Sequence, residues 1–228
     1  MKTWLARSAA AVMIVGSLSV APRAHAEDMN FRLVPISDRD TCRGRCPEVI
    51  AAEGEIVDDT PETFLAFLQR SASDRRVRAV VLFNSPGGRV VASMRLGLQL
   101  RAIGAAAIVA KAAPAEYGAP ARIASGRCFS ACVYALMGGK KRVIPRLSEV
   151  GIHRMFTVES GGRDPSGDQL GTRRTSVHGE IVSQLSAYSG VMGVSRQLVA
   201  NAERISSDTI HVLTPGEIAR WRLGSPRL

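Results

Sequence analysis

The sequence predicts an α/β domain, and three observations support this fold class. Apolar runs of strand length, rich in β-branched residues, alternate along the chain with amphipathic stretches of helical period. No repeat, coiled-coil pattern or long low-complexity stretch interrupts this alternation. The 228 residues are also enough for one domain to bury a sizeable core. Strands that alternate with helices are typical of a sheet covered by helices.

Residues 1–26 have the composition of a secretory signal peptide. Lys2 and Arg7 make the start basic, an apolar run follows over residues 9–20, and Ala24-His25-Ala26 is a small-x-small exit. The apolar run is shorter than the roughly 18 residues that would cross a bilayer. We therefore expect an exported, cleaved protein, with an uncleaved membrane anchor as the alternative.

After this segment we expect an irregular stretch over residues 27–47 and a single domain over residues 48–228, with no membrane span. Strands are expected where apolar, often β-branched residues run together. These runs are residues 49–51, 77–83, 106–110, 143–144 and 150–152. The stretch over residues 112–126 is rich in Ala, Pro and Gly and is expected to be a long loop.

Helices are expected where apolar residues recur every three or four positions. Thr60-Pro61-Glu62 supplies a cap and a first-turn proline, and Thr214-Pro215-Gly216-Glu217 matches a capping box. The expected helices start at Thr60 and near Val90 and cover residues 129–137, 177–188, 196–205 and 214–221.

The chain is basic, with a formal net charge of +10. Removal of residues 1–26 takes away Lys2, Arg7 and Arg23 and leaves +7. The remaining arginines are scattered and aromatic residues make up only 5% of the chain, so the sequence lacks the basic stripe with stacking partners that nucleic-acid binding requires. We interpret the charge as solvated surface and expect no nucleic-acid partner.

Four cysteines form two C-x3-C pairs, Cys42 with Cys46 and Cys128 with Cys132. Cysteines in exported proteins are commonly paired in disulfides. Four cysteines allow three pairings, and the sequence does not choose between them. A four-thiolate zinc site is the alternative, disfavoured by export and by the lack of C-x2-C spacing. We expect no metal and no cofactor.

Three short segments carry chemistry when they occur together. A buried strand runs into Ser85-Pro86-Gly87-Gly88, whose glycines allow a sharp turn and leave amides accessible, as an oxyanion hole requires. Ser130 stands in Cys128-Phe129-Ser130-Ala131-Cys132 at an expected helix start, where the helix dipole favours an anion. His153 ends Gly151-Ile152-His153 and is the usual kind of base for a serine hydroxyl. Each segment alone is more often a turn, a helix cap or a structural histidine.

In this order, the three segments resemble the ClpP/crotonase superfamily, and its ClpP-type serine peptidases in particular. The segments that carry the resemblance are residues 49–56, 80–88, 130–131 with 138–142, 150–153 and 213–224. The resemblance implies a fold of repeated β-β-α units and hydrolysis of peptide bonds through an acyl-enzyme. It also implies a homo-oligomer, for which the helix expected over residues 177–188 would supply the contact.

Carried over residue by residue, the resemblance makes Ser130 the nucleophile and His153 its base. The backbone amides of Gly88 and Ala131 would form the oxyanion hole.

The third catalytic residue departs from the family's pattern. The closing segment aligns Ile210 with the family's aspartate. We therefore predict Asp208, two positions earlier, as the acid, with Glu203 as the second choice.

The nucleophile has alternatives as well. A serine–lysine dyad, as in exported signal-peptide peptidases, is disfavoured because the lysines after Ser130, Lys140 and Lys141, match the segment that leaves the nucleophile helix. Cys128 or Cys132 as nucleophile is disfavoured because exported paired thiols tend to be oxidised. A disulfide between these two cysteines would either brace the turn or hold Ser130 in a geometry that cannot react.

The function predicted from the resemblance is a periplasmic serine peptidase that hydrolyses peptides or unfolded chains. The periplasm lacks ATP, so the protein would act without an ATPase partner. The first alternative is a catalytically inactive peptide-binding or assembly module of the cell envelope. A crotonase-type acyl-thioester enzyme ranks last, because coenzyme A thioesters are not expected outside the cytoplasm.

Overall fold

The computed structural model describes residues 26–36, 47–71, 77–113, 122–159, 173–176 and 179–227. The predicted signal peptide, except for its last residue, lies outside these residues, and so do Cys42 and Cys46. Among the described residues, every helix is too short or too polar to cross a membrane.

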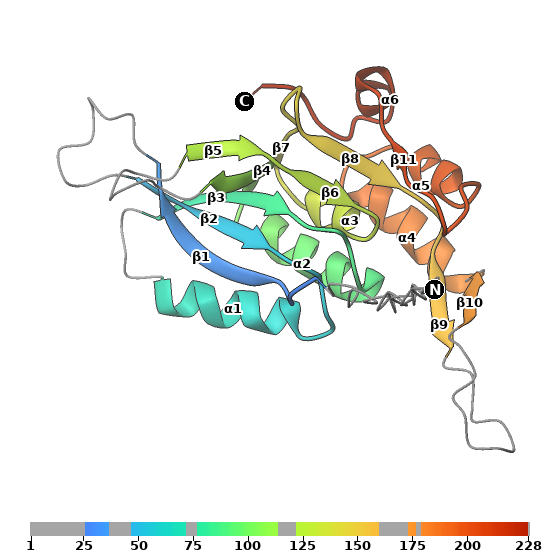
Figure 1. Cartoon of the computed structure of the whole chain (residues 1–228), viewed down its shortest axis with the longest axis horizontal. Helices are drawn as coiled ribbons and strands as arrows, with labels where there is room; N and C mark the ends of the chain where they lie inside the picture. The colour runs from blue at the N-terminus through green and yellow to red at the C-terminus, as the bar shows by residue number, and fades with distance from the viewer. Residues whose placement is uncertain are drawn as a thin grey trace, which may run out of the picture.

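A main sheet of six strands forms the centre of the fold (Figure 1). Its members are β1 (Asn30–Pro35), β2 (Glu48–Glu53), β3 (Val77–Asn84), β4 (Ala106–Ala113), β5 (Arg122–Ser125) and β7 (Lys141–Val143). The strands β2, β3, β4 and β7 run parallel, whereas β1 and β5 pair antiparallel with β2 and β4. The middle of β2 and the second half of β3 are buried, which explains the apolar sequences of these parts.

A second, smaller sheet holds short strands in the order β11-β8-β6. These strands are β6 (Arg127–Phe129), β8 (Glu149–Ile152) and β11 (His211–Val212). Single bridges from Ser85 to Cys128 and from Gly88 to Ile56 extend the layer toward the start of the domain. The smaller sheet and these bridges together form a second layer, which consists of segments that follow the strands of the main sheet along the chain.

The two layers and the helices follow one another in a repeated order. Within the described residues, a main-sheet strand is followed four times by an extended segment of the second layer and then by a helix. The four sets are β2, Ile56 and α1 (Thr60–Ser71); β3, residues 85–88 and α2 (Val90–Ala102); β4, β6 and α3 (Cys132–Met137); and β7, β8 and α4 (Glu180–Val191). The predicted α/β fold of repeated β-β-α units is confirmed by this topology. The pair β9 (Phe156–Glu159) and β10 (Arg173–Ser176) is inserted before α4, and α5 (Gln197–Ala202) and α6 (Pro215–Arg220) follow it.

Helices α1 and α2 lie side by side against the main sheet, and α3 packs on α2 (Figure 1). The larger core cluster fills the space between sheet and helices and includes Phe83, Leu96, Leu100, Leu136 and Leu185. Burial of each such side chain stabilises the fold by about 1.5–3 kcal/mol. The close approach of the helices requires Gly97, because a Cβ there would lie 1.9 Å from the Tyr188 hydroxyl. That hydroxyl donates a 2.7 Å hydrogen bond to the Tyr134 carbonyl and joins α4 to α3.

The guanidinium of Arg142 ties the end of the chain to these helices. It donates hydrogen bonds to the carbonyls of Leu223 (2.7 Å), Arg222 (3.0 Å), Gly139 (3.0 Å), Met192 (3.2 Å) and Met137 (3.3 Å). Arg101 donates to two of the same carbonyls, those of Met137 and Met192. Burial, and then the charge of Arg101, lower the pKa of Arg142. One side chain thus joins the ends of α3 and α4 to the last turn of the fold.

Several expected boundaries were wrong. The segment expected to be irregular contains β1, whose apolar Phe31 and Leu33 alternate with Asn30 and Arg32 as in a half-buried strand. The loop expected over residues 112–126 instead contains the end of β4 and its antiparallel partner β5. The helix expected over residues 129–137 begins three residues later, at Cys132, because residues 127–129 pair with β8.

Candidate active site

The three chemically suggestive segments leave the same end of neighbouring extended segments. Strand β6 runs parallel to β8, with Phe129 opposite Gly151, so Ser130 and His153 both follow the carboxyl ends of these strands. On the other side of β6, Ser85 pairs in parallel with Cys128, and the glycine loop follows Ser85. Parallel pairing therefore brings the glycine loop, the serine and the histidine to one edge of the second sheet.

Ser130 occupies a sharp turn between β6 and α3. Its φ is 53°, in the left-handed region that a residue with a Cβ adopts at a cost of about 1–2 kcal/mol. The Ser130 amide donates to the Gly151 carbonyl at 2.8 Å, and the Ser130 carbonyl accepts from the Val133 amide at 3.1 Å. Such an observed backbone outlier is a feature of functional sites, where the surrounding structure holds the conformation.

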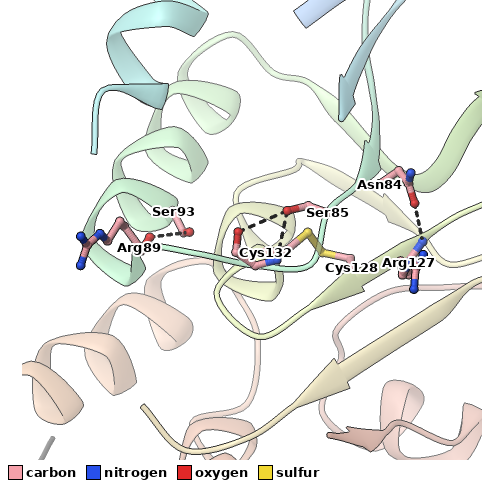
Figure 2. The surroundings of a disulfide bond; sticks show 8 residues. Asn84, Ser85, Arg89, Ser93, Arg127, Cys128 and Cys132 are labelled. Atoms are coloured by element: carbon pink, nitrogen blue, oxygen red, sulfur yellow. Dashed lines mark hydrogen bonds between the residues drawn. A yellow bond between two sulfur atoms is a disulfide. The ribbon is translucent and has the colours of Figure 1, made fainter. Parts of the chain in front are cut away.

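A disulfide brackets this turn. Cys128 and Cys132 are bonded, with a Cα–Cα distance of 5.3 Å, and both are fully buried. Figure 2 shows the bond beside Ser85, between the glycine loop and the start of α3. Of the pairings that the sequence left open, the structure therefore contains the one between Cys128 and Cys132. The other two cysteines, Cys42 and Cys46, lie outside the described residues, so a disulfide between them stays a prediction.

The glycine loop touches the serine turn. Gly87 has a φ of 116°, and a Cβ there would lie 2.8 Å from both the Phe129 carbonyl oxygen and the Ser130 Cβ. The loop is shaped by the buried Ser85 hydroxyl, which accepts a hydrogen bond from the Gly87 amide at 3.1 Å (Figure 2). Only glycine permits this approach, which explains the Gly-Gly pair in physical terms.

The amides predicted to form the oxyanion hole lie on the two sides of this contact. The residues on either side of Gly88 make the hydrogen bonds to Ile56. The Ile56 amide donates to the Gly87 carbonyl, and the Ile56 carbonyl accepts from the Arg89 amide, both at 2.7 Å. Within the described part of the chain, neither the Gly88 amide nor the Ala131 amide has a hydrogen-bond acceptor. Both amides are thus available to bind an oxyanion.

His153 is buried, with 9% of its surface exposed. Its Nδ1 lies 2.8 Å from the Arg154 carbonyl oxygen. A carbonyl oxygen only accepts hydrogen bonds, so in the neutral ring Nδ1 carries the proton and Nε2 keeps the lone pair that a base uses. The ring also stacks on Phe156, with centroids 5.7 Å apart. Neither contact was foreseen, because the first involves backbone and the second follows the recognised motif.

The structure places the candidate acids at different points. The β8–β11 register ends with Ile152 opposite His211, so His153 and Ile210 are the next residues along the two segments. The Ile210 side chain lies against Gly151, where an added Cβ would be 2.4 Å from Ile210 Cγ2. Asp208 is exposed, and its carboxylate accepts a 3.4 Å hydrogen bond from the Ser206 hydroxyl. Its assignment as the catalytic acid stays a prediction.

Glu203, the second choice, stands just after α5 and is half-buried. Its Oε1 accepts a 3.2 Å hydrogen bond from the Met155 amide, two residues beyond His153. Glu203 also lines a cavity of about 490 Å³ between α4 and α5, together with Arg196 and residues of α4.

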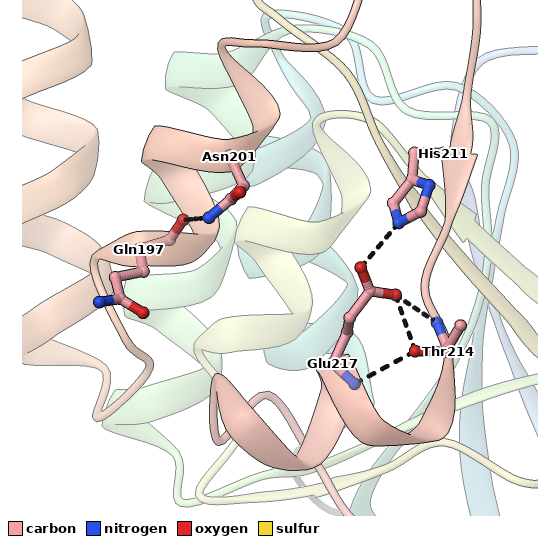
Figure 3. Close-up of polar contacts among 5 residues, drawn as sticks. All are labelled: Gln197, Asn201, His211, Thr214 and Glu217. Atoms are coloured by element: carbon pink, nitrogen blue, oxygen red, sulfur yellow. Dashed lines mark hydrogen bonds and ion pairs between the residues drawn. The ribbon is translucent and has the colours of Figure 1, made fainter.

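The segment after β11 is held by a capping box. Thr214 accepts from the Glu217 amide, while Glu217 Oε2 accepts from the Thr214 amide at 2.8 Å, and His211 Nε2 lies 2.9 Å from Glu217 Oε1 (Figure 3). These contacts, the backbone hydrogen bond first, lower the pKa of Glu217 to about 2. The carboxylate therefore fixes the start of α6 against β11.

The described residues contain no cluster of three or more His, Cys, Asp or Glu side chains that would hold a metal ion. Lys140 and Lys141 are exposed beyond the far end of α3, the helix that starts beside Ser130. The groups that the three segments bring together are a serine, a histidine and backbone amides.

Comparisons with known proteins give only distant similarity. No family model matches the chain, and no curated protein matches it. Two solved structures of the 1510-N membrane-bound stomatin-specific protease are similar at 18% identity. One, a serine-to-alanine mutant, has a TM-score of 0.45 and covers 74% of this chain and 72% of its own. The other, a lysine-to-alanine mutant in complex with a substrate peptide, has a TM-score of 0.46 and covers 77% and 70%. The fold is therefore assigned from the repeated β-β-α topology of the chain itself.

Proposed function

We propose that this protein is a serine peptidase with Ser130 as nucleophile and His153 as general base. The observation that carries the proposal is the meeting of three segments at one edge of the second sheet: the glycine loop, the left-handed Ser130 turn and the histidine after β8. This meeting joins a base, a nucleophile and two amides that have no acceptor within the described residues.

In the proposed reaction, Ser130 Oγ attacks the carbonyl carbon of a peptide bond and its proton passes to His153 Nε2. The oxygen that becomes negative is bound by the amides of Gly88 and Ala131. The C–N bond then breaks, and the histidine gives its proton to the leaving amine. Water, deprotonated by the same histidine, hydrolyses the acyl-enzyme and restores the serine.

The proposal places the protein in the periplasm, acting on peptides or unfolded chains without an ATPase partner. The composition of residues 1–26 supports export, and the disulfide beside Ser130 suits an oxidising compartment. We also propose a homo-oligomer, for which α4 offers a contact surface with the 78% exposed Val191. Sedimentation of the purified protein tests the assembly.

The test of the function is labelling of the oxidised protein from residue 27 onward with a fluorophosphonate probe. Wild type is expected to react, while Ser130→Ala and His153→Ala are not. Ser183→Ala, which removes an exposed hydroxyl on α4, is the matched control and should label like wild type. A folded wild type that stays unlabelled, or a Ser130→Ala protein that still cleaves peptides, contradicts the proposal.

A peptide-binding module without catalysis is the second candidate. It is favoured by Ile210, an apolar residue that precedes the His211–Ile152 pair at the position that the sequence resemblance aligns with a catalytic aspartate. Such a protein would bind peptides in a pull-down assay and ignore the fluorophosphonate, so the same experiment separates the two functions.

A further inference from the structure

Glu203 and His153 make hydrogen bonds to the same peptide group. His153 Nδ1 donates to the Arg154 carbonyl oxygen at 2.8 Å, and the Met155 amide donates to Glu203 Oε1 at 3.2 Å. The Arg154 carbonyl and the Met155 amide are the two ends of one planar peptide unit. We propose that Glu203 is the acidic positioning residue of the site and acts on His153 through this peptide group, an inference that rests on the proposed function.

A peptide group can transmit the effect of a carboxylate. Resonance couples its N–H to its C=O, so an anion at the amide increases the negative charge on the carbonyl oxygen. Hydrogen bonds arranged in a chain polarise one another and strengthen in a partly buried site. The Arg154 carbonyl thereby becomes a better acceptor for Nδ1–H and a better partner for the imidazolium that forms when Ser130 gives up its proton.

The peptide group is fixed on both sides by the segment that follows α5. Arg154 donates to the Ile205 carbonyl twice, from its amide at 3.1 Å and from Nε at 3.0 Å. Ile205 in turn donates to the Ala202 carbonyl, and Leu198 and Ala202 of α5 are fully buried. The core therefore holds Glu203 and the acceptor of His153 in one rigid arrangement, which a positioning role requires.

Other charged and titratable groups surround this pair. Burial, and then the negative charge of Glu203, raise the pKa of Tyr134 on α3. The Arg154 guanidinium donates to the Ile205 carbonyl, and Arg196 lines the cavity together with Glu203. Asp208 precedes β11, and His211 lies in β11 opposite Ile152 of β8. A test must therefore remove the Glu203 charge and leave these other groups in place.

Glu203→Gln meets that need, because it keeps the shape of the side chain and an oxygen that can accept from Met155. The first measurement is NMR titration of the His153 ring in a Ser130→Ala background, with and without Glu203→Gln. We expect the midpoint of the titration to fall by about one pH unit, since a carboxylate one peptide group away favours the protonated ring. Glu180→Gln, an exposed glutamate on α4, is the control and should leave the midpoint unchanged.

The second measurement is the rate of fluorophosphonate labelling across pH 5–9 in proteins that keep Ser130. Glu203→Gln is expected to be about tenfold slower at the plateau, with its midpoint moved to lower pH. Glu203→Asp keeps the charge and should retain the wild-type midpoint, so it serves if the glutamine variant folds poorly. A direct triad carboxylate is worth about 10⁴-fold, so the transmitted effect is expected to be smaller.

The outcomes separate this inference from the proposed function. If wild type labels but Glu203→Gln has the same midpoint, or loses rate only in proportion to a lower melting temperature, the role of Glu203 is overturned and the peptidase stands. If Asp208→Asn moves the midpoint and Glu203→Gln does not, Asp208 is the acid. If wild type never labels, the peptidase is overturned, and the NMR shift still decides whether Glu203 sets the protonation of His153.

Discussion

The two halves of the candidate site are held by different kinds of force. The nucleophile half, residues 85–89 and 127–133, is held by ladder hydrogen bonds, a buried disulfide and glycines that leave no room for a Cβ. The acid half, residues 203–217, is largely exposed and is held by a few backbone hydrogen bonds to β8 and the residues after it, together with side-chain contacts such as that of His211 with Glu217. Backbone geometry is hard to replace, whereas polar side-chain contacts can be exchanged. This difference fits the sequence resemblance, which covers the residues of the nucleophile half and departs at the expected acid.

Gly88→Ala should change stability and labelling most, because the added Cβ forces the backbone of the nucleophile half to move. A Cβ at Gly88, where φ is 131°, would lie 2.0 Å from the Ile56 carbonyl oxygen. We expect the free energy of unfolding to fall by about 3 kcal/mol and the labelling of Ser130 to be lost. Chemical denaturation followed by circular dichroism measures the first, and the fluorophosphonate assay the second.

Gly104→Ala is the matched control for that substitution. Gly104 also has a positive φ, 68°, but a Cβ there would meet nothing within 4 Å. We expect a loss of about 1 kcal/mol with normal labelling. Equal stability of the Gly88→Ala and wild-type proteins would mean that the loop can rearrange to accept a Cβ. The backbone of the nucleophile half would then be no more tightly held than that of the acid half.

Removal of the disulfide tests whether the nucleophile half needs its covalent brace. In the double variant Cys128→Ala/Cys132→Ala, the unfolded chain regains the freedom of a short closed loop, so stability is expected to fall by about 2 kcal/mol. Labelling should slow by about tenfold, because Ser130 can then leave its left-handed conformation. The double variant should also lose any response of the labelling rate to a reductant. Unchanged labelling would assign the disulfide to stability alone.

Acid should weaken the acid half through Glu217. The pKa of this carboxyl is about 2 in the fold against an ordinary 4.5, so its contribution is fully present above pH 4.5 and is lost as the pH falls toward 2. Solvent screens this exposed site, and we expect about 1 kcal/mol. Urea denaturation gives the free energy of unfolding at pH 5 and at pH 2.5. The loss between these two pH values should be about 1 kcal/mol smaller in Glu217→Gln than in wild type. An identical difference in both proteins would contradict this account.

Of these substitutions, Ile210→Asp should change stability least. It tests directly whether a carboxylate in the acid half affects His153. Ile210 is 40% exposed, so stability should stay within about 0.5 kcal/mol. Position 210 precedes the His211–Ile152 pair and position 153 follows it, so the new carboxylate is expected to raise the NMR midpoint of His153 by about half a pH unit. Ile210→Asn, of the same shape without the charge, should leave it unchanged. A midpoint that does not move would show that position 210 does not face the ring.

The sequence predicted the parts of the molecule in which residue type and backbone are tightly linked. Parallel strands were indicated by apolar runs, and the sharp turn at Gly87-Gly88 by its two glycines. It also located the serine and the histidine, which the structure brings to one edge. The strand β1 was missed although Phe31 and Leu33 carry its alternation, because the prolines and arginines around it favoured an irregular segment.

The acceptor of His153 could not be predicted in the same way. The Arg154 carbonyl is a backbone group, and any residue type at this position would offer the same oxygen. Glu203 reaches the Met155 amide across a sequence separation of 48 residues, which only the packing of α5 determines. Contacts of this kind leave no local pattern in the chain.

The hydrogen bonds of Arg142 to five carbonyls imply an order in which parts of the chain dock during folding. Two of its partners, Arg222 and Leu223, are among the last residues described, and two others close α3 and α4. Until residues 222 and 223 have docked, this half-buried cation lacks part of its coordination. The helix that begins beside Ser130 is therefore fully secured only late in folding, after residues 222 and 223 have reached Arg142.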